Sequence, residues 1–166
     1  MMKIIIVIAF LMSVGCDKNP NASDNGTVSG GLDYIYINEF LASNDGCCSD
    51  ENSEFDDFIE IYNSGSTSVD IGGMYITDDL DKPSEYQIPS TSSELTTILP
   101  NGFLLLWADK DTEQGVLHLD IKLSGDGESI GLYAADGITV IDSLTFNTQT
   151  TDISYGRNPD GGNEWF

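Results

Sequence analysis

The stretch Leu117-His118-Leu119-Asp120-Ile121-Lys122-Leu123 decides the fold, because its apolar and polar residues alternate without interruption. In an extended strand, successive side chains point to opposite faces. The leucines and the isoleucine therefore share one face, while His118, Asp120 and Lys122 share the other. The pattern predicts a strand with one face against a core, and it places His118, the only histidine of the chain, on the solvent-facing side.

Short runs rich in Ile, Tyr, Val and Phe lie on both sides of this strand, separated by turn signals such as Pro100-Asn101-Gly102 and Gly125-Asp126-Gly127. No long helical pattern and no internal repeat interrupts them. The sequence therefore predicts one all-β domain over residues 32–166, a sandwich of short strands. The runs predicted to form strands are residues 34–40, 57–63, 73–77, 103–108, 129–133 and 139–146.

The beginning of the chain has a different composition. Lys3 is followed by nine apolar residues, 4–12, which is fewer than the roughly 20 that a membrane-spanning helix needs. Residues 1–15 are therefore predicted to be a signal peptide. Residues 16–31 are rich in Asn, Ser, Gly and Asp, a composition typical of a flexible linker.

The end of this leader, Val14-Gly15-Cys16, resembles the signal of bacterial lipoproteins, in which the cysteine becomes the lipidated first residue of the mature chain. The resemblance implies lipidation at Cys16. It also implies an extracytoplasmic domain anchored to a membrane by lipid, at the outer membrane or the cell surface if the source has one.

The charge of the chain limits its partners. Lys and Arg number 6 against 28 Asp and Glu, a net charge of -22, and loss of residues 1–15 removes Lys3 and leaves -23. Nucleic-acid binding requires clustered basic residues, so this composition argues against it. Anionic lipid headgroups are disfavoured for the same reason, which leaves the lipid anchor as the route to a membrane. Divalent cations and basic partners are favoured.

One segment of the mature chain is densely acidic, and no basic residue lies between positions 45 and 60. Carboxylate and amide oxygens at alternate positions favour a hard cation such as Ca²⁺. The alternative is a solvated acidic loop that keeps the protein soluble. Residues 109–115 also offer alternating oxygens, but we interpret them as a turn between strands. The predicted calcium ligands are Asp45, Asp50, Asn52, Glu54, Asp56 and Asp57.

Cys47 and Cys48 remain once Cys16 is assigned to lipid. An even number of cysteines in an oxidising compartment favours a disulfide. Adjacent Cα atoms lie only about 3.8 Å apart, below the usual disulfide range, so a bond between them is strained. We therefore expect either free thiols or a vicinal disulfide, as a local feature of a loop.

The sequence assembles none of the common catalytic motifs. It contains no Gly-x-Ser-x-Gly elbow, no His-Glu-x-x-His pair and no glycine-rich phosphate loop after a strand. His118 would act as a base only beside a nucleophile, and a histidine on the surface of a strand is the simpler interpretation. The chain is therefore predicted not to be an enzyme.

Arg157 is the sole arginine, and it is predicted to pair with a carboxylate. If alternation continues through residues 34–40, Glu39 falls on the core face with Ile35 and Ile37. A carboxylate in a core needs a charge-assisted partner such as a guanidinium group. The prediction is a structural ion pair between Glu39 and Arg157. The alternative is a bulge that turns Glu39 outward and leaves Arg157 on the surface.

Several short motifs of the domain form a recognisable set. They include Ile37-Asn38-Glu39-Phe40-Leu41-Ala42-Ser43-Asn44, Asp57-Phe58-Ile59-Glu60-Ile61-Tyr62-Asn63, Leu106-Trp107-Ala108-Asp109 and Gly156-Arg157-Asn158-Pro159-Asp160-Gly161. With these motifs, residues 32–166 resemble the lamin-tail domain, an immunoglobulin-like β-sandwich. The resemblance implies this fold, and it implies a binding or scaffolding module without chemistry of its own.

Together these observations predict a noncatalytic, lipid-anchored extracytoplasmic binding or adaptor domain that recognises a protein or an extracellular polymer. No cofactor is implied apart from Ca²⁺. The first alternative is a calcium-stabilised adhesion or structural module. A more distant one is an accessory domain of a secreted hydrolase system.

Overall fold

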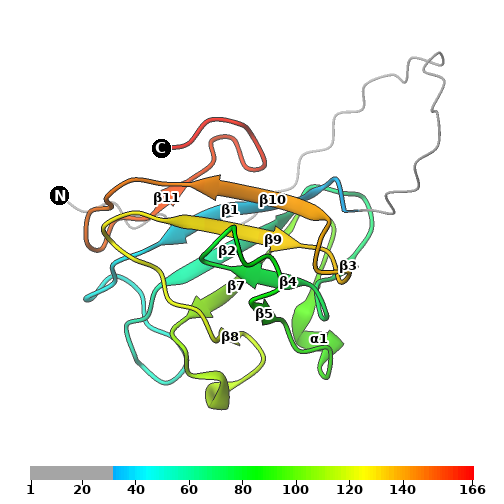
Figure 1. Cartoon of the computed structure of the whole chain (residues 1–166), viewed down its shortest axis with the longest axis horizontal. Helices are drawn as coiled ribbons and strands as arrows, with labels where there is room; N and C mark the ends of the chain where they lie inside the picture. The colour runs from blue at the N-terminus through cyan, green and yellow to red at the C-terminus, as the bar shows by residue number, and fades with distance from the viewer. Residues whose placement is uncertain (1–31) are drawn as a thin grey trace.

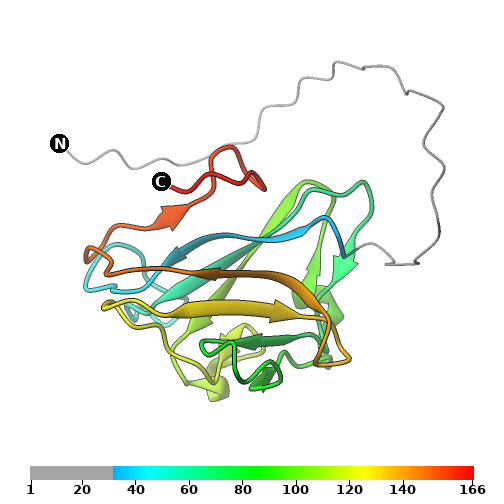
Figure 2. The same cartoon turned by 45° about the horizontal axis from the view of Figure 1, so that its top comes forward.

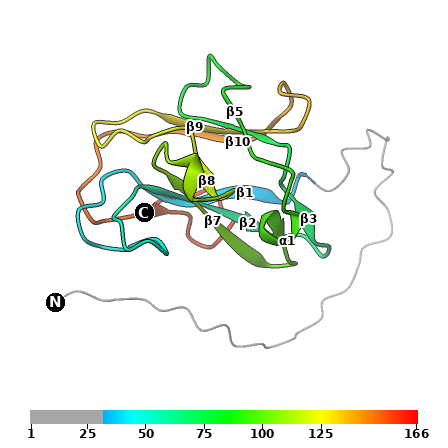
Figure 3. The same ribbon diagram turned by 90° about the horizontal axis from the view of Figure 1, so that it is seen from below.

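The computed structural model describes residues 32–166, which form a sandwich of two main β-sheets. The predicted signal peptide 1–15, the lipidation site Cys16 and the linker 16–31 lie outside the described residues. None of the helices in the described part is long and apolar enough to cross a membrane. The all-β, immunoglobulin-like prediction is confirmed, and Figure 3 shows the two sheets as separate layers.

The larger sheet has the strand order β11-β1-β2-β7-β8, and all of its pairs are antiparallel except β7 with β8. The smaller sheet has the order β10-β9-β4-β5 and is antiparallel throughout (Figure 1). The strands of the larger sheet are β1 (Ile35–Leu41), β2 (Phe58–Asn63), β7 (Gly102–Ala108), β8 (His118–Leu119) and β11 (Tyr155–Gly156). Those of the smaller sheet are β4 (Tyr75–Thr77), β5 (Tyr86–Gln87), β9 (Ser129–Tyr133) and β10 (Val140–Thr145).

Short elements complete the fold. A separate pair of strands, β3 (Val69–Asp70) and β6 (Thr97–Ile98), closes one end of the sandwich. The helical elements are a single turn each, α1 (Ser93–Thr96) and the 3-10 helix η1 (Thr112–Gln114). The chain after β11 turns back along the edge of the larger sheet, as the red segment in Figure 2 shows.

The core lies between the two sheets and consists mainly of isoleucine and leucine. Ile37, Ile61 and Leu106 of the larger sheet and Ile76 and Leu132 of the smaller sheet are fully buried. Each such side chain contributes roughly 1.5–3 kcal/mol when removed from water. The core therefore supplies the main stabilisation, as the alternation of the strands predicted.

The predicted strand over residues 117–123 is confirmed in part. Only His118 and Leu119 form β8, and Lys122 makes an isolated bridge with Asp109. Leu119, Ile121 and Leu123 point into the core as expected. The placement of His118 on a solvent-facing side was wrong, because its side chain is completely buried.

A β-bulge at Asn38 shifts the register between β1 and β2 after Ile37. Beyond the bulge Glu39 stands opposite Glu60, and both are only partly buried. At the bulge, the backbone N–H and carbonyl of Ile37 form hydrogen bonds with side chains. Its N–H donates to Asp142 Oδ2 at 2.9 Å, and its carbonyl accepts the Arg157 Nε–H at 2.8 Å.

The carboxylate that pairs with Arg157 is that of Asp142 in β10, at 2.9 Å from Nη2, so the predicted Glu39 partner was wrong. The bulge rotates Glu39 away from the core, as the alternative proposed. Arg157 nevertheless stays buried, with 8% of its side chain exposed, because it lies against the rings of Tyr36 and Trp165. A guanidinium group that is removed from water needs other hydrogen-bond acceptors. Here these are the Asp142 carboxylate and the carbonyls of Ile37 and Gly162.

Arg157→Ala is expected to lower the free energy of unfolding by roughly 3–5 kcal/mol, because it leaves Asp142 and the Ile37 carbonyl without their partner. Urea unfolding measures the change. Lys82→Ala is the matched control, since Lys82 pairs with Asp79 at the exposed surface and its loss should leave the unfolding midpoint nearly unchanged. An unchanged unfolding midpoint for Arg157→Ala would contradict the structural role of the pair.

Candidate functional site at the acidic end of the sandwich

Two connections meet at one end of the larger sheet. One is the long loop between β1 and β2, and the other is the segment between β7 and β8 that contains η1 (Figure 1). We call the cluster that they form the acidic end. It consists of Asp50, Glu51, Glu54, Asp56, Asp109 and His118.

His118 lies at the centre of the acidic end with its side chain 0% exposed. Its Nδ1 is 2.5 Å from Asp109 Oδ2, and its Nε2 is 3.2 Å from Glu51 Oε1. Burial alone would lower the pKa of His118, but the hydrogen bonds to Asp109 and Glu51 outweigh it and raise the pKa. Both groups that contact the ring nitrogens are carboxylates, so the imidazole is positioned to hold a positive charge or to share an ion with them.

Asp50 shapes the loop that brings Glu51 to His118. Its Oδ1 accepts the backbone N–H groups of Asn52 at 2.9 Å and Glu54 at 2.8 Å, which closes a tight turn around residues 50–54. Asp50 is itself buried. Desolvation opposes ionisation, but the donated hydrogen bonds lower the pKa of Asp50, so it stays a carboxylate.

Gln114 joins the two connections. Its Nε2 donates to Glu54 at 2.6 Å and to Asp111 at 2.9 Å, and its Oε1 accepts from Asn52 Nδ2 at 2.5 Å. One neutral amide thus lies among the carboxylates of two segments that repel each other. The arrangement gives residues 109–115 a part in the acidic end that the sequence interpretation as a simple turn missed.

Three of the six predicted calcium ligands converge, and one of these three also belongs to a second cluster. Ligand atoms of Asp50, Glu54 and Asp56 lie within 4.8 Å of one another, and so do those of Asp50, Glu51 and His118. Burial and the charges of Asp109, Asp50 and Glu54 raise the pKa of Asp56. Glu51 and His118 were absent from the prediction, because nothing in the spacing of the loop indicates that it folds over β8.

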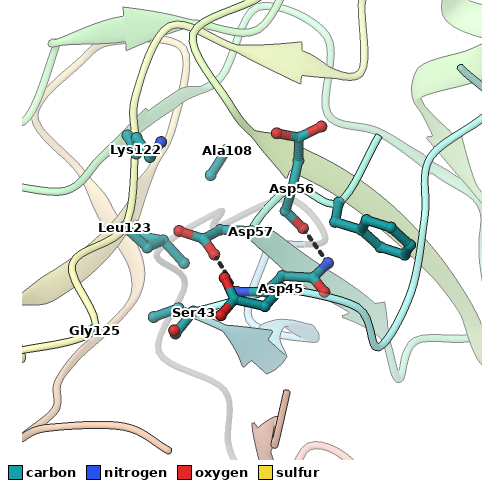
Figure 4. Close-up of a pocket in the computed structure, with 11 residues that line it drawn as sticks. Ser43, Asp45, Asp56, Asp57, Ala108, Lys122, Leu123 and Gly125 are labelled. Carbon is teal, nitrogen blue, oxygen red and sulfur yellow. Dashed lines mark hydrogen bonds between the residues drawn. The ribbon is translucent and has the colours of Figure 1, made fainter. Parts of the chain in front are cut away.

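Asp45 and Asp57 lie beside this cluster and line a separate polar pocket of 260 Å³ together with Asp56 and Lys122 (Figure 4). Burial raises the pKa of Asp57 to about 6, although the N–H of Asn44 and the charge of Lys122 act in the opposite direction. The structure therefore does not gather all six predicted residues around one point.

Cys47 and Cys48 are free thiols whose sulfur atoms lie 2.8 Å apart. Asp152 holds this part of the loop, since its Oδ1 accepts the N–H groups of Asp45, Gly46 and Cys47. Burial and the hydrogen bond with Cys47 raise the pKa of Cys48 to about 12. Cys48 packs against Leu41, Phe58 and Trp107, so it acts here as a small apolar residue rather than a reactive thiolate.

The outer face of the larger sheet carries a row of three aromatic rings. Tyr36, Tyr62 and Phe103 stand opposite one another on β1, β2 and β7. The rings of Tyr62 and Phe103 stack at 4.6 Å, and Phe103 remains 44% exposed. We call these three residues the aromatic patch. Gly161 packs on it with a φ of +68°, and a Cβ there would lie 3.2 Å from the Tyr36 ring.

Comparison with known proteins agrees with this fold. Residues 32–148 match the family model described as Lamin Tail Domain, which covers more than half of the chain. Neither the curated proteins nor the solved structures include a match. The family has an immunoglobulin-like, noncatalytic fold and commonly mediates protein interactions. The extent of this match and the two-sheet sandwich together show that the chain belongs to the lamin tail domain family.

Proposed function

We propose that the protein is a noncatalytic binding domain, displayed outside the cytoplasm on a lipid anchor, which recognises a protein or an extracellular polymer through the aromatic patch. The observation that carries this proposal is the row of rings on β1, β2 and β7. Tyr and Phe side chains supply large contact areas and are enriched at interfaces. The interactions typical of the family support the same conclusion.

The surroundings of the aromatic patch indicate the chemistry of its partner. Asn38 lies next to the patch and donates to Glu60 Oε1 at 3.0 Å and to Asp160 Oδ1 at 3.2 Å. Glu39 stands opposite Glu60 on the same outer face. An apolar centre bordered by carboxylates fits a partner with an apolar contact and basic groups at its rim.

A photo-crosslinking amino acid at Phe103 is expected to trap a specific partner in cells, because Phe103 is the most exposed ring of the aromatic patch. Tyr62→Ala should weaken binding of that partner roughly tenfold, the typical effect of losing an aromatic hot spot. Ile138, 78% exposed and outside the larger sheet, is the control position. Equal crosslinks from Ile138 and Phe103 would exclude the patch as the binding surface.

The anchor is proposed from the leader and from the charge of the chain. A mature charge of -23 repels anionic headgroups, so attachment has to be covalent. A diacylglycerol group on Cys16 supplies two acyl chains, which suffices for stable anchoring.

Intact-mass spectrometry of the membrane fraction is expected to find a mature chain that begins at Cys16 and carries diacylglycerol. Cys16→Ser should release the protein from the membrane fraction, and Cys47→Ser, which leaves the lipoprotein signal intact, should not. An unmodified amino terminus at Asp17 or beyond would refute the anchor and leave the aromatic patch proposal standing.

A second candidate function is a calcium-stabilised adhesion or structural module. The observation that favours it is the convergence of the Asp50, Glu54 and Asp56 carboxylates within 4.8 Å. Carboxylate oxygens suit a hard cation, which would complete its coordination with carbonyls and water. Burial first, and then the neighbouring carboxylates, raise the pKa of Asp56, and a bound cation would offset the repulsion.

Calcium at a hundredfold excess over Kd is expected to raise the free energy of unfolding by about 2.7 kcal/mol, and the melting temperature rises with it. Glu54→Gln should abolish the shift, while Asp45→Asn, outside the three-carboxylate cluster, should keep it. An unchanged melting temperature at millimolar calcium would refute the calcium-stabilised module.

A further inference from the structure

We propose that His118, Asp50 and Glu51 form a binding site for a divalent transition metal ion of the zinc class, with Asp109 orienting the imidazole. Ligand atoms of the three residues lie within 4.8 Å of one another. The inference goes beyond the proposed function, because it does not depend on the aromatic patch or on the lipid anchor. It also differs from the calcium candidate, which uses oxygen ligands only.

The buried imidazole is the first reason. His118 is 0% exposed, and the Asp109 side chain that contacts its Nδ1 is 3% exposed. We assign the proton on Nδ1 from this hydrogen bond, because a carboxylate only accepts. By the same argument Nε2 donates its proton to Glu51, and a metal ion would take the place of that proton. A histidine whose Nδ1–H is held by a carboxylate while Nε2 faces further ligands is the arrangement by which proteins orient a metal-binding imidazole.

The second reason is the spacing of the ligand atoms. Two ligands bound to one tetrahedral zinc at about 2.0–2.1 Å lie about 3.3 Å from each other. His118 Nε2 and Glu51 Oε1 are already 3.2 Å apart. Asp50, held in place by the N–H groups of Asn52 and Glu54, offers a third ligand atom within 4.8 Å of the other two. Three protein ligands leave a fourth position for water, on the side where Glu51 is 64% exposed.

The third reason is chemical selectivity. Calcium and magnesium prefer oxygen ligands, whereas an imidazole nitrogen with carboxylates suits zinc and related ions. Asp50 is common to both clusters of the acidic end. The residues that distinguish them are therefore Glu51 and His118 on one side and Glu54 and Asp56 on the other.

Binding of the ion would attach the loop between β1 and β2 to the larger sheet. Asp50 and Glu51 belong to the loop between β1 and β2, while His118 belongs to β8. An ion between them fastens this loop to the larger sheet at the point where many negative charges gather. The same loop carries Cys48 over Leu41 and Trp107, so occupancy also steadies the cover of that outer apolar cluster.

Isothermal titration of zinc into the purified full chain tests the site, in a background where Cys16, Cys47 and Cys48 are replaced by serine so that no thiolate contributes. We expect one ion per chain. Glu51→Gln and Asp109→Asn should each weaken binding by roughly 10–100-fold, the usual cost of losing a ligand or the residue that orients one. Glu54→Gln is the matched control and should leave zinc affinity unchanged.

Cobalt substitution provides a readout that folding defects do not imitate. Co²⁺ bound to nitrogen and oxygen ligands in a four-coordinate site gives strong visible absorption, and this band should be present in the starting chain and absent in Glu51→Gln. Glu51 is largely exposed, so its variant is expected to fold. Failure of the cysteine-free chain to bind zinc would overturn the proposal. Equal loss of zinc in Glu54→Gln and Glu51→Gln would also overturn it, in favour of unspecific carboxylate binding.

Discussion

The buried pair between Arg157 and Asp142 holds together three parts of the chain that are distant in sequence. Asp142 belongs to the smaller sheet, Ile37 to the larger sheet, and Arg157 to the segment after β11. The two charged groups take over the N–H and the carbonyl that the bulge in β1 would otherwise leave without partners. Unsatisfied backbone groups in a core are costly, so the pair stabilises the bulge by bonding to both of these groups.

Both proposed sites are connected to β1, the strand that carries the bulge. On one side of it Tyr36 stands opposite Tyr62, which aligns the aromatic patch, and on the other side Glu39 stands opposite Glu60. Further along, β1 leads into the loop that folds over β8 and brings Glu51 to His118. The aromatic patch and the acidic end, for which we propose a macromolecular partner and a cation respectively, are thus separate regions of the fold.

The alternation of residues 117–123 was sufficient to predict a strand and the burial of Leu119, Ile121 and Leu123. The alternation did not predict the burial of His118. Its ring nitrogens are bound by Asp109 and by Glu51, and Glu51 lies 67 positions away in the sequence. Strand periodicity likewise assigned Glu39 to the core, since a bulge leaves no signal in a hydrophobic pattern. The density of acids in residues 45–57 led to the prediction of a calcium site, which stays a prediction. The clustering of Asp50 with Glu51 and His118 depends on tertiary contacts that the sequence does not indicate.

His118 is buried, is held at Nδ1 by Asp109 and faces Glu51 at Nε2, where we propose that a metal ion replaces the proton. The chain has a single histidine, so the two ring nitrogens can be observed without ambiguity by ¹⁵N NMR. One equivalent of zinc should shift the Nε2 resonance strongly, while Nδ1 keeps its proton. A ring that exchanges its protons rapidly with water, and whose nitrogens do not respond to zinc, would contradict the claim.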